Sequence, residues 1–114
     1  MAITQKRLFG PESLLFDGPI ASTKYTVPAS TTTIVKQVIL CNATANAVTA
    51  MVHCVPSGVP TAAASNVILN AVSLAANETI MLSMSLVMSA GDKIAASCSV
   101  DLAVTMIVNG VEEA

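Results

Sequence analysis

A chain of 114 residues suits one domain, large enough to bury a hydrophobic core without disulfides or metals. Only 11% of its residues are charged and 54% are hydrophobic, whereas soluble domains average about 25% charge. The net charge of −2 and the scatter of the basic residues argue against nucleic acid as a partner. The excess of apolar over charged residues indicates that other protein chains cover part of the surface.

This apolar composition does not predict a membrane span. No charged residue occurs between positions 37 and 77, but Asn, Thr and Ser interrupt each apolar run before it reaches about 18 residues. The first ten residues lack the apolar segment of a signal peptide, so we expect synthesis in the cytosol. In that reducing compartment, Cys41, Cys54 and Cys98 are expected to remain free thiols.

Two Gly-Pro pairs, at 10–11 and 18–19, distinguish the N-terminal segment from the rest of the chain. They exclude a long helix and favour short extended pieces. We predict that residues 1–22 form an extended arm that lies over the domain or reaches a neighbour. Its large apolar side chains are the candidate protein-contact residues: Leu8, Phe9, Leu14, Leu15 and Phe16. A flap that closes the domain's own core would use the same residues equally well.

From residue 23 onward, β-branched and alternating segments are separated by turn residues. We expect strands at 23–27, 32–42, 47–55, 66–74, 79–88, 93–99 and 102–111. The second and third are expected to form a hairpin across the turn at 43–46. No segment has a sustained helical period. Residues 23–114 are therefore predicted to be all-β: one antiparallel, jelly-roll-like β-sandwich of seven or eight strands.

Strict alternation assigns the side chains of these strands to two faces. Within 32–42 it places Val35 and Val38 on opposite faces, both of them largely apolar. Within 79–88 it separates Ile80, Leu82, Met84, Leu86 and Met88 from Met81, Ser83, Ser85 and Val87. Methionines at this spacing are more typical of a core than of a binding surface.

No catalytic, metal-binding or cofactor-binding arrangement is predicted. His53 is the one histidine, and its neighbour Cys54 should point to the opposite face of a strand. We expect His53 to be a half-exposed strand residue. The cysteines lack the spacing of zinc ligands, and the isolated glycines form no phosphate loop. Asp92 follows Gly91 in a turn, where its carboxylate is expected to cap the local backbone.

Five short motifs spread over residues 23–113 resemble a known protein family. They are residues 25–29 (YTVPA), 33–42 (TIVKQVILCN), 55–58 (VPSG), 86–95 (LVMSAGDKIA) and 110–112 (GVE). Together they resemble the small virion proteins of tailed bacteriophages, which are β-sandwich modules of capsid or tail. The motifs are structural rather than catalytic, so the resemblance identifies a scaffold better than a role.

The resemblance implies a non-enzymatic virion structural protein without a cofactor, most simply a capsid decoration or cement protein. It would be made in the cytoplasm of the bacterial host and reside in the virion. Expected partners are copies of itself, for example as a trimer, and the major capsid protein or neighbouring virion subunits; neither nucleic acid nor a membrane is expected. The alternative is a tail fibre, baseplate or receptor-binding module that recognises carbohydrate through the loop at 56–65. Head or tail position and oligomer number stay open.

Overall fold

The alternating segments form eight β-strands and one short 3-10 helix in the computed structural model, which describes residues 3–14, 22–59, 62 and 64–114. The strands are β1 (Ile3–Ser13), β2 (Ser22–Thr26), β3 (Thr32–Asn42), β4 (Val48–Val55), β5 (Val67–Leu74), β6 (Thr79–Met88), β7 (Lys93–Cys98) and β8 (Val104–Glu113), and η1 (Ala64–Asn66) precedes β5. All seven strands predicted from residue 23 onward are present, with bounds shifted by two residues at most.

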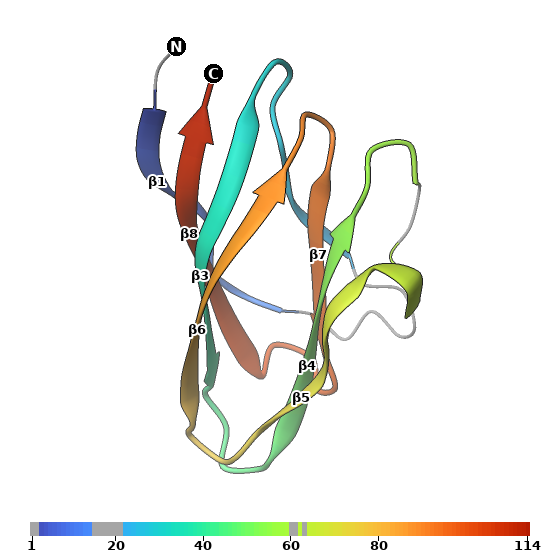
Figure 1. Ribbon diagram of the computed structural model, residues 1–114. Coiled ribbons are helices and arrows are strands. Elements are labelled where there is room, and N and C mark those ends of the chain that lie inside the picture. The colour runs from blue at the N-terminus through green and yellow to red at the C-terminus, as the bar shows by residue number, and fades with distance from the viewer. Residues whose placement is uncertain (1–2, 15–21, 60–61, 63) are drawn as a thin grey trace.

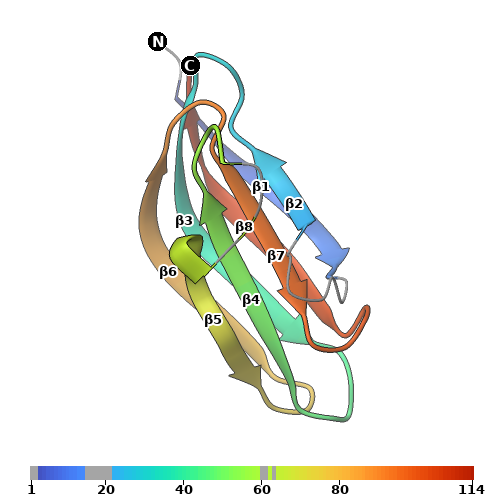
Figure 2. The same ribbon diagram turned by 90° about the vertical axis from the view of Figure 1, so that its right-hand side faces the viewer.

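The strands form two antiparallel sheets that lie face to face (Figure 1, Figure 2). The first sheet has the order β1-β8-β3-β6 and the second sheet the order β2-β7-β4-β5. Each of the first four strands is paired with one of the last four: β1 with β8, β2 with β7, β3 with β6 and β4 with β5. The chain is thus a long antiparallel ribbon folded over on itself, the jelly-roll arrangement. The predicted all-β sandwich is confirmed.

The predicted hairpin between β3 and β4 is wrong, because the two strands lie in different sheets. The connection between them turns around the buried amide of Asn42. Its Nδ2 donates to the carbonyls of Asn46 (2.8 Å), Leu74 (3.3 Å) and Ala75 (3.0 Å). Its Oδ1 accepts hydrogen bonds from both the backbone and the hydroxyl of Thr44. This single side chain therefore satisfies buried backbone groups in two connections and directs the chain from one sheet to the other.

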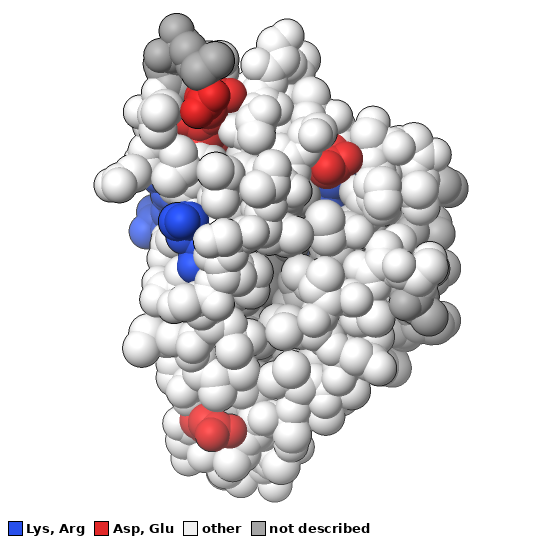
Figure 3. Space-filling model, viewed as in Figure 1, with Lys and Arg blue, Asp and Glu red and all other residues white. Residues whose placement is uncertain are grey.

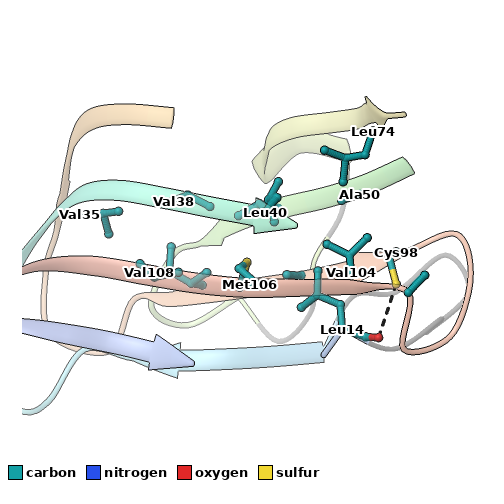
Figure 4. Close-up of a cluster of buried hydrophobic side chains, with 14 of the residues drawn as sticks. Leu14, Val35, Val38, Leu40, Ala50, Leu74, Cys98, Val104, Met106 and Val108 are labelled. Atoms are coloured by element: carbon teal, nitrogen blue, oxygen red, sulfur yellow. Dashed lines mark hydrogen bonds between the residues drawn. The ribbon is translucent and has the colours of Figure 1, made fainter. Parts of the chain in front are cut away.

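The core between the sheets is aliphatic (Figure 4). Its members include Leu14, Val35, Val38, Leu40, Ala50, Leu74, Cys98, Val104, Met106 and Val108. Val35 and Val38 both face inward, contrary to strict alternation, because the register of β3 with its neighbours shifts between Val35 and Gln37. This β-bulge at Lys36 changes the phase of the strand and lets both valines reach the core.

Residues 3–14 belong to the sandwich, so the predicted separation of an N-terminal arm from a domain starting at 23 is wrong for them. β1 pairs with β8 from Ile3 opposite Glu113 to Ser13 opposite Thr105. Gly10, with a φ of +85°, lies where the register shifts, so the first Gly-Pro pair forms a bulge instead of ending the strand. Residues 15–21 of the predicted arm lie outside the described residues.

Replacing Asn42 by Asp should test its role as the donor that organises two connections. The substitution keeps the shape and the acceptor but removes the amide protons, leaving three carbonyls without this donor. We expect the free energy of unfolding to fall by about 2 kcal/mol or more at neutral pH, because buried polar groups would lose their partners. Urea unfolding followed by circular dichroism measures the loss. Asn46→Asp, at an exposed position, is the matched control and should change stability by less than about 0.5 kcal/mol.

Candidate interaction surface

The structure divides the candidate contact residues of the N-terminal segment. Leu14 is fully buried in the core between the sheets, so its predicted role as a partner contact is wrong. Its backbone N–H donates to Val104 (2.7 Å), which holds it beyond the end of β1. Leu8 and Phe9 are half-buried and pack against the same core, as the flap alternative anticipates. Leu15 and Phe16 lie outside the described residues.

The outward side of the first sheet is almost uncharged over β6, β3 and β8. Residues directly opposite each other in an antiparallel sheet share a face. The register therefore defines rows across the three strands: Thr79–Cys41–Thr105, Met81–Ile39–Ile107, Ser83–Gln37–Asn109 and Val87–Ile34–Val111. Between the first and last rows, Lys36 is the one charged residue. We call this surface the neutral face.

Two large apolar side chains of the neutral face are open to solvent. Met81 is 66% exposed and Val87 is 64% exposed, whereas Met88 on the inner side of the same strand is fully buried. Met84 packs against the core, so the expectation of core methionines holds for Met84 and Met88 but not for Met81. The alternation of the strand separates these residues correctly, but it does not say which side is covered.

At one end the neutral face continues into a hollow of about 390 Å³ lined by Gln5, Lys6, Lys36, Asn109, Gly110 and Val111. Two lysines and two amides border it, so this end of the face is polar and basic. Lys6 forms an ion pair with Glu112 (3.1 Å), and Lys36 donates a long hydrogen bond to Ser85 (3.5 Å). Both lysines that border the hollow therefore interact with other residues of the same domain.

Charges are distributed unequally between the two flanks of the sandwich. Figure 2 shows β1 and β2 along one flank and β5 and β6 along the other. β1 and β2 contain Lys6, Arg7, Glu12 and Lys24. β5 and β6 contain no charged residue, and the space-filling view from their side is uncharged across its centre (Figure 3). The neutral face therefore continues around an uncharged flank.

A polar cluster on the charged flank joins the two sheets. The hydroxyl of Tyr25 on β2 donates to Glu112 Oε2 on β8 and lies 2.8 Å from Thr33 Oγ1 on β3. Lys6 on β1 completes the cluster from the other side of Glu112. Burial, reinforced by the hydrogen bond to Glu112, raises the pKa of Tyr25 to about 12. The hydrogen bond from Tyr25, with help from Lys6, lowers the pKa of Glu112.

Sequence reasoning missed this cluster, although the YTVPA and GVE motifs contain two of its members. Tyr25 and Glu112 are 87 residues apart, and only the pairing of the ribbon brings them together. The cluster links β2 of the second sheet to β1, β3 and β8 of the first sheet through hydrogen bonds and one ion pair. We assign it a structural role.

His53 is buried, with 2% of its surface exposed, and the expectation of a half-exposed residue is wrong. Near it, Ala62 packs against Val55 and Ala95 on the second sheet. His53 Nδ1 lies 3.0 Å from Asn66 Oδ1 in this region. Cys54 packs against the core between the sheets, which confirms that the two neighbours point to opposite faces.

Asp92 caps its turn as predicted and also joins a second loop. Its Oδ2 accepts from the backbone N–H of Ser89 (2.9 Å), and its Oδ1 accepts from that of Ser57 (2.8 Å). The turn between β6 and β7 is thereby fixed to the loop after β4. Within the described residues, His, Cys, Asp and Glu side chains form no group of three that could hold a metal ion.

Comparisons with known proteins add no relative: no family model, curated protein or solved structure matches the chain. In the part of the chain that the structure describes, there is no helix with the length and hydropathy needed to cross a membrane. The evidence for the candidate site is therefore the surface itself, a sheet face with Lys36 as its one charge, bordered by an uncharged flank.

Leu14→Ala should separate a core role from a partner contact. We expect it to lower the free energy of unfolding by about 2–5 kcal/mol, because removal of a buried leucine leaves a cavity between the sheets. Chemical denaturation of the purified protein measures this. Val100→Ala, at a half-exposed position, is the control and should cost less than about 0.5 kcal/mol. If Leu14→Ala lowers the free energy of unfolding no more than the control does, Leu14 is not a core residue and is again a candidate partner contact.

Ultraviolet titration should report directly on the polar cluster, because Tyr25 is the one tyrosine of the chain. Tyrosinate absorbance should rise with a midpoint near 12 instead of 10. The stabilisation linked to this shift is present below pH 10 and is lost as the pH rises through about 12. Glu112→Gln should move the midpoint down toward 10, whereas Glu113→Gln should leave it in place. The same midpoint in all three proteins would contradict the assigned contact.

Proposed function

We propose that the chain is a non-enzymatic virion structural protein of a tailed bacteriophage, most simply a capsid decoration or cement protein that assembles as a homo-oligomer on the particle. The observation that carries this proposal is the neutral face. Exposed Met81 and Val87 lie there, on a surface in which Lys36 is the one charge. Surfaces of this kind are typical of protein–protein contacts.

The phage assignment itself comes from the resemblance of the sequence motifs, and the fold is compatible with it. Jelly rolls occur in viral capsid proteins but also in lectins and cupins, so the fold alone selects no function. A subunit that covers its apolar surface with neighbours needs few charges of its own, which agrees with a charged fraction of 11%.

A carbohydrate-binding tail module is less well supported. Sugar sites commonly use an exposed aromatic ring, and the chain has no tryptophan. The one tyrosine, Tyr25, is half-buried and engaged with Glu112 and Thr33. Binding of the purified protein to a glycan array would favour this alternative over the decoration protein.

Particle binding tests the proposed function. Purified protein should co-sediment with phage heads, and electron microscopy with a labelled antibody should locate it on the capsid. Ile107→Lys places a charge in the centre of the neutral face and should reduce occupancy at least about tenfold, because a charge buried without a partner is costly. Ala76→Lys, in the exposed turn after β5, is the control and should bind normally. Absence of the unmodified protein from heads would refute the decoration role.

A further inference from the structure

Among the edge strands that the structure describes, β6 alone lacks all three of charge, proline and a residue of positive φ, features that oppose pairing with another chain. Proteins protect edge strands with charges, proline, bulges or short length. β1 has Lys6, Arg7 and Pro11; β2 is five residues long and contains Lys24. β5 is interrupted near Ala71, whose φ is +50°, and its register with β4 shifts there. β6 has ten residues without a charge, proline or glycine.

The free edge of β6 is uncharged, and the register of β6 with β3 shifts between Ser83 and Leu86, opposite Lys36. In the described part of the chain, β6 pairs with β3 on one side and with no strand on the other. Burial alternates along its whole length, so its backbone remains in one extended phase. An unpaired row of N–H and C=O groups on a flat strand is a template for an added strand.

The sequence of this strand is self-complementary when it is read against itself in the antiparallel direction. With Met84 opposite Met84, the pairs are Ile80 with Met88, Met81 with Val87, Leu82 with Leu86 and Ser83 with Ser85. Apolar residues then oppose apolar residues, and the serines oppose each other. A shift by two residues would place Met81 opposite Ser85, or Ser83 opposite Val87. Only the register centred on Met84 matches polar with polar throughout.

We propose that two copies of this chain pair through the free edges of β6, antiparallel and centred on Met84. A two-fold axis perpendicular to the sheet would relate the copies, as expected of an interface that one surface forms with itself. The two first sheets would become one continuous sheet of eight strands, since each contributes four. The inference rests on the proposed homo-oligomer and names the interface that builds it.

Two further features favour a second copy as the occupant of this edge. Ile80, Met84 and Leu86 pack against the core and are only half-buried, so an added strand with the same apolar side chains would complete their burial. The neighbouring edge strand β5 is also uncharged, so the second sheets of two copies could approach without repulsion between like charges.

A pair of double variants tests both the partner and the register. Ser83→Lys with Ser85→Lys would place a lysine opposite a lysine of the partner at two positions. Ser83→Lys with Ser85→Glu would place a lysine opposite a glutamate at the same two positions. Both serines are exposed on the neutral face, so both variants should fold, which circular dichroism verifies. Sedimentation equilibrium should give dissociation constants that differ at least about tenfold, with the opposite-charge variant tighter.

Cysteine cross-linking provides a second measurement that does not depend on added charge. Met84→Cys should form a disulfide between copies under mild oxidation, because directly opposed residues in an antiparallel pair have Cα atoms about 4.5–5.5 Å apart, within disulfide reach. Leu82→Cys should not cross-link to itself, because its partner in this register is Leu86. Mass spectrometry of the cross-linked peptides distinguishes these disulfides from those of the native cysteines.

Each outcome decides a separate point. Equal dissociation constants for the two double variants, or equal cross-linking at 82 and 84, would overturn the pairing through β6. A trimer unaffected by either double variant would overturn it as well and leave the proposed homo-oligomer intact. A wild-type protein that stays monomeric at millimolar concentration would refute both, while co-sedimentation with heads would still decide the virion role.

Discussion

The sandwich depends on the packing of its two apolar sheet faces against each other. The fully buried hydrophobic side chains of the core, among the described residues, are aliphatic or sulfur-bearing, and each square ångström of apolar surface that they bury contributes about 25 cal/mol. β8 pairs with both β1 and β3, so the first sheet is assembled around it. At Gly110 a Cβ atom would lie 2.4 Å from the carbonyl oxygen of Ile34. The close approach of β8 to its neighbours therefore requires a residue without a side chain at this position.

Local pattern predicts the strands well and their pairing poorly. A strand is recognisable because its residues alternate over a few positions, whereas pairing is decided by residues far apart. Asn42 contacts the carbonyls of Leu74 and Ala75, and nothing in the turn at 43–46 reveals that contact. The bulge at Lys36 is equally invisible in the local sequence, because it is defined by the pairing of β3 with β6 and β8. A hairpin between β3 and β4 is the expected result of proximity in sequence, but these long-range contacts place the two strands in different sheets.

The candidate surface was only partly predictable, for a related reason. Low charge led to the expectation that partners cover some surface, but it does not locate that surface. Leu14 belongs to a segment that reads as irregular, yet its backbone is hydrogen-bonded to Val104 and its side chain is in the core. Met81 belongs to a regular strand and is exposed. Alternation separates two faces of a strand, and only the position of the second sheet shows which face it covers.

Several of the charged side chains act within the domain. Lys6 and Glu112 pair with each other in the cluster that joins the sheets, and Asp92 accepts two backbone hydrogen bonds. Charges engaged in this way do little to keep an uncharged strand edge apart from another copy. The proposed pairing through β6 would cover the uncharged β5–β6 flank and leave the charged β1–β2 flank in water. The division of charge between the two flanks is therefore the basis on which we propose that the neutral flank faces the second copy.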